Sequence, residues 1–309
     1  MVARVAAIDC GTNSIRLLVA DPPDPAAGPA GPLVELTRRL ELVRLGQGVD
    51  RTGRLAPEAI ERTRVALAGY AGAIAELGAD RVRMCATSAS RDAENADEFV
   101  AMVVATLGVA PEVVSGDEEA RLSFAGAVRG LTAQPPYLVV DIGGGSTEFV
   151  VGESTVDTAI SVDIGCVRMT ERHLPGDPPG AGQIAAARDD IAAAVDRALA
   201  AVGGRDATTL VGLAGSVTTV AAIALGLDTY RPDRIHHTRV SYDDVAKVTT
   251  ELLGRSARQR MAYPVMHAGR ADVIGAGALI LRTIMERAGM SSVVASEHDI
   301  LDGIALSLR

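Results

Sequence analysis

Short runs of apolar residues, interrupted by glycine turns, recur along the chain. Val2–Ile8 and Ile15–Ala20 flank one such turn, and Tyr137–Ile142 and Thr147–Gly152 flank another. Runs in which apolar and polar positions do not alternate are typical of strands that are buried on both faces of a sheet. The pattern therefore predicts two β-hairpins, each in its own sheet.

Segments of helical length separate the other apolar runs. The longest predicted helices are Pro57–Leu77, Asn95–Leu107, 118–130, Gln183–Val202, Tyr242–Leu253, Ala271–Ala288 and Ile300–Leu308. Residues 21–32 are rich in Pro, Gly and Ala and predict a loop. The order of hairpin, third strand, helix, strand and helix occurs twice. This order predicts an α/β protein of the actin-like ATPase (ribonuclease H-like) fold, with two similar lobes and a central cleft.

A length of 309 residues suits two domains better than one. We expect the first actin-like lobe at residues 1–120 and the second at residues 121–297. The final helix, at 298–309, is expected to pack back onto the first lobe.

Composition and charge narrow the classes of function. The net charge of −9 argues against general nucleic-acid binding. No run approaches the ~18 apolar residues of a membrane span, and the N-terminus lacks the pattern of a signal peptide. Cys10, Cys85 and Cys166 are widely spaced and predict neither a disulfide framework nor a zinc site. These features predict a cytoplasmic protein without a membrane partner.

The two glycine turns suit anion binding, because glycine lets backbone N–H groups approach a ligand closely. One turn contains Gly143, Gly144, Gly145 and Ser146, and the other contains Gly11, Thr12, Asn13 and Ser14. We predict that both bind phosphate. The alternative is a pair of tight hairpin turns with no ligand.

Carboxylates flank these turns. Asp141 and Glu148 enclose the second turn, and Asp9 is the counterpart of Asp141 before the first. Carboxylate oxygens are ligands that Mg²⁺ prefers, so the three acids are the predicted metal site. The alternatives are capping of strand ends and the Mg–ATP site of an actin-like kinase.

The adjacent His236 and His237 are expected to point to different faces of their element. They therefore do not predict a metal pair.

Three motifs follow one another along the chain: Asp9–Ser14, the Ser115–Leu122 stretch SGDEEARL, and Asp141–Glu148. In this order and at this spacing they together resemble the exopolyphosphatase/guanosine pentaphosphate phosphohydrolase (Ppx/GppA) family. The resemblance extends over almost the whole chain. It implies hydrolysis of the terminal phosphate of inorganic polyphosphate or of guanosine pentaphosphate with Mg²⁺ or another divalent cation. It further implies the short, two-domain type of the family and a homodimer.

The resemblance also assigns roles to single residues. Glu119, at the start of a predicted helix, would be the general base for the attacking water. The alternative is that an acid in the first turn only favours the helix dipole, which suits Asp117 and Glu118. Arg91 would bind phosphate oxygens, and Gly215 and Ser216 would bind later phosphates of the chain.

The predicted function is that of an exopolyphosphatase acting on short or medium chains through a water activated by Glu119. The alternatives are a guanosine pentaphosphate 5′-phosphohydrolase and a non-catalytic protein that binds polyphosphate or guanosine penta- or tetraphosphate. An actin-like kinase is disfavoured because Glu119 stands in its SGDEEARL setting.

Overall fold

The computed structural model describes residues 3–23 and 33–308. The chain forms two compact units: unit 1 comprises Met1–Gly130 with Asp299–Arg309, and unit 2 comprises Leu131–His298. Most of the predicted loop at 21–32 lies outside the described residues.

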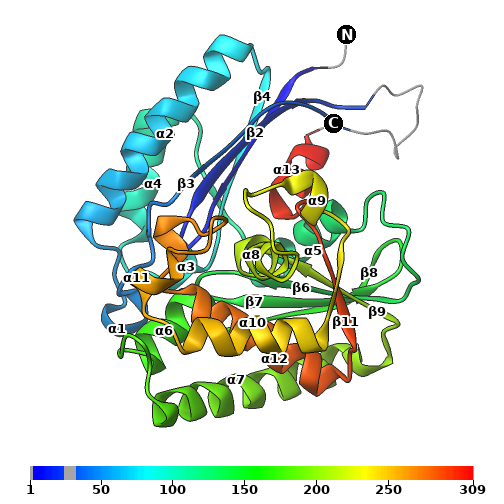
Figure 1. Cartoon of the computed structure of the whole chain (residues 1–309). Coiled ribbons are helices and arrows are strands. Elements are labelled where there is room, and N and C mark those ends of the chain that lie inside the picture. The colour runs from blue at the N-terminus through cyan, green and yellow to red at the C-terminus, as the bar shows by residue number, and fades with distance from the viewer. Residues whose placement is uncertain (1–2, 24–32, 309) are drawn as a thin grey trace. The chain divides into compact units, whose positions relative to one another are not determined.

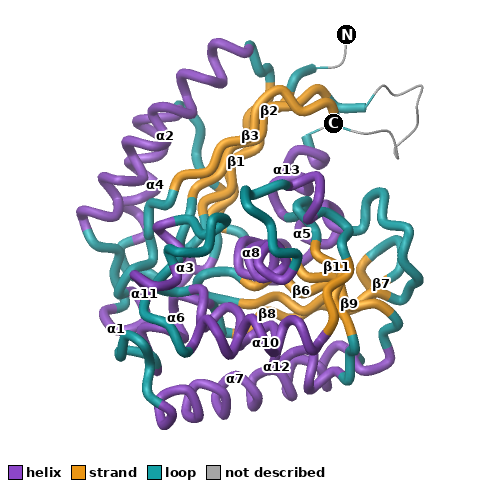
Figure 2. The backbone as a smooth tube through the Cα atoms, in the orientation of Figure 1, coloured by secondary structure: helices purple, strands orange, loops and turns teal. Residues whose placement is uncertain are grey.

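Unit 1 is a five-stranded sheet with helices on both faces (Figures 1 and 2). The sheet order is β3-β2-β1-β4-β5; β1, β2 and β3 are antiparallel, and β4 and β5 extend the sheet in parallel with β1. Its elements are β1 (Val5–Cys10), β2 (Ile15–Asp21), β3 (Val34–Glu41), α1 (Val49–Thr52), α2 (Pro57–Leu77), β4 (Arg81–Ala86), α3 (Ser88–Asp92), α4 (Ala96–Leu107), β5 (Glu112–Val113), α5 (Gly116–Ala127) and α13 (Ile300–Ser307).

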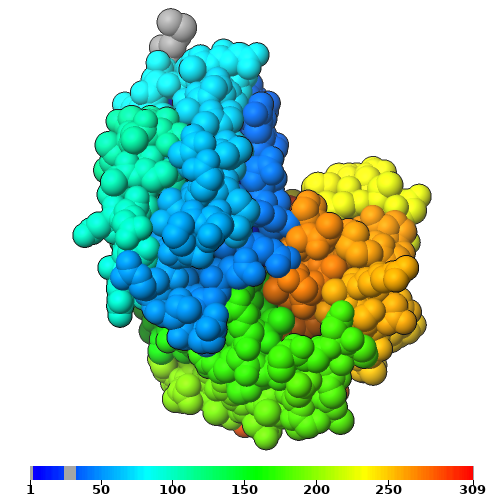
Figure 3. Space-filling view, turned by 90° about the vertical axis from the view of Figure 1, so that its left-hand side faces the viewer, coloured from blue at the N-terminus to red at the C-terminus, as the bar shows by residue number. Residues whose placement is uncertain are grey.

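The apolar runs of unit 1 supply buried side chains to both faces of this sheet, because successive side chains of a strand point to opposite sides. Ala6 and Ile8 of β1 pack with residues of α2 and α4. Val5 and Ala7 pack on the other face with residues of α5 and α13. Figure 3 shows α2 and α4 as the cyan to green outer layer of unit 1.

The C-terminal helix α13 packs on α5 through two glycines. A Cβ at Gly303 would lie 2.0 Å from the carbonyl oxygen of Leu122, and a Cβ at Gly126 would lie 2.0 Å from that of Asp299. Only glycine permits this approach. The expected boundary at residue 120 falls inside α5, and unit 1 continues past the end of that helix to Gly130.

Unit 2 repeats the arrangement with a six-stranded sheet in the order β10-β11-β9-β6-β7-β8. Read from β8 to β11, the strand order and directions match those of β3 to β5 in unit 1. Its elements are β6 (Tyr137–Ile142), β7 (Thr147–Gly152), β8 (Val156–Val162), α6 (Cys166–His173), α7 (Ala181–Val202), β9 (Thr209–Leu213), α8 (Ala214–Ala224), α9 (Pro232–Ile235), β10 (Arg239–Ser241), α10 (Tyr242–Leu253), α11 (Ala257–Arg260), α12 (Ile274–Ala288) and β11 (Ser292–Ala295).

The repeated topology confirms the predicted α/β fold of actin-like ATPase type. Among the longest predicted helices, α12, expected from Ala271, differs most at its start. Helix α12 begins at Ile274, because Ala268–Arg270 forms a separate 3-10 turn. Helix α8 begins at Ala214, directly after β9, because Ala214 has a φ of 65° and reverses the chain within one residue. In the described residues, no helix is long and apolar enough to cross a membrane.

Replacing Gly303 by Ala tests the close packing of α13. The new methyl group would meet backbone, so we expect the variant to lose about 1–3 kcal/mol of unfolding free energy, measured by thermal and urea unfolding. Gly72→Ala is the control, because a Cβ there meets nothing within 4 Å and Ala should stabilise α2 by about 0.5–1 kcal/mol. Equal stability of the two variants would contradict the packing.

Candidate active site

The glycine turn between β6 and β7 has its carbonyl oxygens occupied. The start of α6 holds them through Cys166 N–H to Gly143 O at 2.9 Å, Val167 N–H to Gly144 O at 2.9 Å and Arg168 Nε–H to Gly145 O at 2.7 Å. The N–H groups of Gly144 and Gly145 meet no acceptor among the described residues. Amides of this kind suit an anionic ligand.

Asp141 and Glu148 stand directly opposite each other across the β6–β7 ladder. Opposed residues share one face of the sheet, with Cβ atoms roughly 5 Å apart. Their exposed fractions are 8% and 1%, and Ser161 Oγ donates to Glu148 Oε1 at 2.7 Å. Two buried carboxylates at this spacing repel each other unless a cation lies nearby. Their oxygen donors suit Mg²⁺.

The corresponding turn of unit 1 has an arginine in the place of that second acid. Asp9 stands opposite Arg16, whose Nε and Nη2 donate to Asp9 Oδ2 at 3.0 and 2.7 Å. Arg16 Nη1 also donates to Oδ2 of Asp299, the residue that caps α13. Burial raises the pKa of Asp9 and outweighs the opposing effect of Arg16. Burial also raises the pKa of Asp299, but the guanidinium of Arg16 lowers it by more, so the pKa of Asp299 lies below its ordinary value.

Several buried polar atoms near the first turn have no partner among the described residues. They are Asp9 Oδ1, Asn13 Oδ1 and, on α3, Ser90 Oγ. Helix α3 is connected to the turn by a 2.8 Å hydrogen bond between Ser88 Oγ and Thr12 Oγ1. Gly11 N–H donates to Ser14 O at 2.9 Å and closes the turn. Unsatisfied buried groups call for a water, ion or ligand, so this part of unit 1 is also a candidate binding region.

Glu119 and Arg91, predicted from distant parts of the sequence, lie together in unit 1. Arg91 Nη1 donates to Glu119 Oε2 at 3.1 Å and to Val114 O at 2.8 Å. Glu119 is 8% exposed in the first turn of α5, which Ser115 caps by accepting from Glu118 N–H at 3.2 Å. The neighbouring acids face other arginines: Glu118 pairs with Arg83 and Asp117 with Arg121. Only Glu119 is therefore both buried and held by the predicted phosphate-binding arginine.

Gly215 and Ser216 lie in the first turn of α8 and are arranged differently from the two hairpin turns. The guanidinium of Arg270 covers Gly215, where a Cβ would lie 2.2 Å from Arg270 Cζ. The Ser216 hydroxyl lies against Gly277 of α12, where a Cβ would be 2.2 Å from its Oγ. The side chain of Ser216 therefore packs inside unit 2, and Arg270 is the group above the glycine. No sequence pattern places Arg270 here, because its position depends on the missing Cβ of Gly215.

The expectation that His236 and His237 point to different faces is wrong. Their rings stack with centroids 3.7 Å apart, and His298 lies 4.3 Å from His236. His237 has a φ of 61°, which turns its side chain back over its neighbour. Burial and the nearby His298 lower the pKa of His237. No group of three or more His, Cys, Asp or Glu residues is placed to hold a metal within residues 3–23 and 33–308.

Known proteins resemble this chain in both sequence and structure. A sequence model of the Ppx/GppA phosphatase family matches residues 27–308. The chain belongs to this family. It is 52% identical to Exopolyphosphatase 2 of Mycobacterium tuberculosis, over 99% of both proteins.

Two solved structures extend the comparison. The crystal structure of an exopolyphosphatase-like protein is similar with a TM-score of 0.93 and 42% identity, over 99% of this chain and 97% of that one. The Aquifex aeolicus member of the Ppx/GppA family is similar with a TM-score of 0.82 and 30% identity, over 99% and 97%.

The opposite pKa shifts of Asp9 and Asp299 predict opposite effects on stability. A raised pKa means that ionised Asp9 costs stability at neutral pH, so Asp9→Asn should keep or raise the melting temperature. A lowered pKa means that Asp299 stabilises the fold above its ordinary pKa and loses this effect as the pH falls. Asp299→Asn should therefore cost about 3–5 kcal/mol at pH 7. Thermal melts at pH 7 check both, and equal losses would contradict the assignment.

Proposed function

We propose that the chain is an exopolyphosphatase that releases terminal orthophosphate from inorganic polyphosphate, with a preference for short or medium chains. The choice of polyphosphate as substrate rests on the 52% identity, over 99% of both proteins, to the M. tuberculosis protein named Exopolyphosphatase 2. The geometry within each unit supports the roles proposed below for single residues.

Backbone amides would bind the terminal phosphate groups. In unit 2, the carbonyl oxygens of the Gly143–Ser146 turn are held by α6, while the N–H groups of Gly144 and Gly145 have no acceptor among the described residues. In unit 1, the turn of Gly11, Thr12, Asn13 and Ser14 adjoins Ser90, whose hydroxyl has no partner among the described residues and can donate to a phosphate oxygen. The backbone of Gly215 and Ser216, beneath Arg270, is proposed for later phosphates.

Asp141 and Glu148 would hold Mg²⁺, because two buried carboxylates face each other there across the β6–β7 ladder. Asp9 is a further proposed ligand through its buried Oδ1, which meets no partner in the described parts of the chain. A bound Mg²⁺ would neutralise charge on the phosphate oxygens as the phosphoanhydride breaks.

Glu119 would accept a proton from the attacking water. Its Oε2 is fixed by Arg91 Nη1, so the carboxylate is oriented before substrate arrives. Among the described residues, Arg91 donates hydrogen bonds through Nη1 only. Its other donors, Nε and Nη2, suit phosphate oxygens. Hydrolysis then needs no covalent intermediate with the protein.

Guanosine pentaphosphate offers the same terminal phosphoanhydride, so this catalytic chemistry serves either substrate. The first experiment therefore compares phosphate release from short polyphosphate, long polyphosphate, guanosine pentaphosphate and ATP. Fastest release from short polyphosphate supports the proposal. Release from guanosine pentaphosphate alone would contradict polyphosphate as the substrate. Binding of these compounds without phosphate release from any of them would contradict the proposed hydrolase activity.

Glu119→Gln should lower turnover about 10²–10⁴-fold, because the amide cannot accept the proton of water. Binding of polyphosphate should persist, because the phosphate-binding amides are untouched. Single-turnover phosphate release and binding calorimetry measure the two effects.

Glu118→Gln is the matched control for Glu119→Gln. Glu118 is the adjacent acid in the same helical turn, but it faces Arg83 at 3.4 Å rather than Arg91. Turnover should stay near that of the unmodified protein. A similar loss in both variants would contradict a specific role for Glu119.

Asp141→Asn should weaken Mg²⁺ and Mn²⁺ binding by at least about tenfold, since it removes one of two opposed carboxylates. Calorimetric titration with Mn²⁺ measures this without turnover. Asp157→Asn is the control, because Asp157 is an exposed acid of β8 in the same sheet. Unchanged Mn²⁺ affinity in Asp141→Asn would remove Asp141 from the metal site.

A further inference from the structure

The face of the unit 1 sheet that α13 covers holds five charged side chains connected by ion pairs and hydrogen bonds. Asp9, Asp299 and Asp302 are buried, and Arg16 and Arg38 form ion pairs with them. Buried charges in proteins are paired or coordinate a metal. The bonds made by each carboxylate oxygen therefore show which of these groups has a place left for a ligand.

Two arginine–aspartate pairs of unit 1 use both oxygens of the carboxylate. Arg38 donates from Nη2 to Asp302 Oδ1 at 2.8 Å and from Nη1 to Oδ2 at 3.3 Å. Arg4 donates from Nε to Asp21 Oδ1 at 2.8 Å and from Nη2 to Oδ2 at 3.1 Å. In this forked arrangement two N–H groups match two carboxylate oxygens, so neither oxygen is left over.

The pair of Arg16 and Asp9 is arranged differently. Arg16 Nε and Nη2 both donate to Asp9 Oδ2, at 3.0 and 2.7 Å, while the buried Asp9 Oδ1 has no partner among the described residues. The third nitrogen, Nη1, donates to Asp299 Oδ2. The guanidinium thus holds two aspartates at once, and a turn that served both oxygens of Asp9 would move Nη1 away from Asp299.

Asp299 is itself fixed at the start of α13. Its Oδ1 accepts from Leu301 N–H at 3.0 Å, and its N–H donates to Asp302 Oδ2 at 3.1 Å. Arg38 in turn holds both oxygens of Asp302. The carboxylate that Arg16 reaches therefore has a defined position and cannot follow Arg16 freely.

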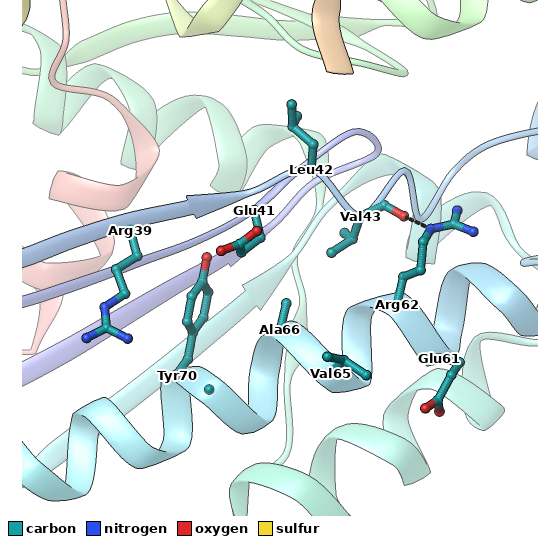
Figure 4. Close-up of a pocket in the computed structure, with 10 residues that line it drawn as sticks. Arg39, Glu41, Leu42, Val43, Glu61, Arg62, Val65, Ala66 and Tyr70 are labelled. Carbon is teal, nitrogen blue, oxygen red and sulfur yellow. Dashed lines mark hydrogen bonds between the residues drawn. The ribbon is translucent and has the colours of Figure 1, made fainter. Parts of the chain in front are cut away.

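The strand that carries Arg16 is fixed as well. Tyr70 reaches from α2 toward the sheet, as Figure 4 shows, and its Oη donates to Ile15 O at 2.9 Å. Ile15 is the residue before Arg16 in β2. Arg16 therefore lies between two fixed points, the start of β2 and the start of α13.

We propose that Arg16 and Asp299 are positioning residues that hold Asp9 so that its Oδ1 stays free for a divalent cation. The inference rests on the proposed role of Asp9 as a ligand of Mg²⁺, which prefers carboxylate oxygens. The charges agree with it, because the three aspartates of this group, Asp9, Asp299 and Asp302, outnumber its two arginines, Arg16 and Arg38. A cation at Asp9 Oδ1 would balance the excess negative charge.

Arg16→Lys tests the geometry at constant charge, because lysine lacks the rigid fork of donors that reaches Asp9 and Asp299 together. Calorimetric titration with Mn²⁺ should show an affinity lower by about tenfold or more. In the Asp9→Asn background the same substitution should have little effect, since Arg16 acts through Asp9. A merely structural role would lower the Mn²⁺ affinity equally in both backgrounds and would overturn the inference.

Arg4→Lys is the matched control. Arg4 pairs with Asp21 at the end of the β1–β2 hairpin away from the turn, through a fork that leaves neither carboxylate oxygen free. The Mn²⁺ affinity of this variant should equal that of the unmodified protein. Arg38→Lys acts one step further from Asp9 and should weaken Mn²⁺ binding less than Arg16→Lys does. It provides the same test if Arg16→Lys does not fold.

The outcomes separate this inference from the proposed function. Weaker Mn²⁺ binding in Asp141→Asn and Asp9→Asn, together with unchanged binding in Arg16→Lys, would overturn the inference alone. Unchanged binding in Asp9→Asn would contradict Asp9 as a ligand and would overturn the inference with it. Unchanged binding in both Asp141→Asn and Asp9→Asn would contradict the proposed metal site itself. Equal losses in Arg16→Lys and Arg4→Lys would also overturn the inference.

Discussion

The rule that opposed residues of an antiparallel pair share one face of the sheet governs both halves of this protein. In each unit, the first hairpin places an aspartate opposite the residue seven positions later. In unit 1 this residue is Arg16, which forms an ion pair with Asp9. In unit 2 it is Glu148, which adds a second negative charge beside Asp141. The same backbone therefore builds an ion pair in one unit and an acidic pair in the other.

Arg16 also connects this hairpin to the end of the chain. It reaches Asp299, which caps α13, and α13 packs on α5 through Gly303 and Gly126. Helix α5 carries Glu119 near its start. The proposed base, the first turn and the last helix thus belong to one packed assembly in unit 1. Disturbing α13 should therefore affect catalysis through the position of α5.

The sequence was sufficient for the fold because strands buried on both faces and repeated glycine turns have strong local signals. It also located the two turns and the acids beside them, whose roles stay proposals. It could not show that Arg91 holds Glu119, since 28 positions separate them and only tertiary packing brings them together. Arg270 over Gly215 and the stacked histidines were missed for the same reason. Each depends on a single backbone angle or a missing Cβ, for which the sequence pattern gives no signal.

The two units also differ in how their ligand-binding features affect stability. Asp9, Asn13 and Ser90 leave buried polar atoms without partners among the described residues, and such atoms cost stability unless a ligand or water satisfies them. The Gly143–Ser146 turn instead satisfies its carbonyls through α6 and leaves only N–H groups at the surface of the turn. The free oxygens of Asp9 and Asn13 are acceptors, so a cation or water, and not a phosphate oxygen, would satisfy them. A phosphate would instead pair with the N–H groups of the Gly143–Ser146 turn. Binding of a cation should therefore stabilise unit 1 and binding of phosphate should stabilise unit 2, since a ligand stabilises the state that contacts it.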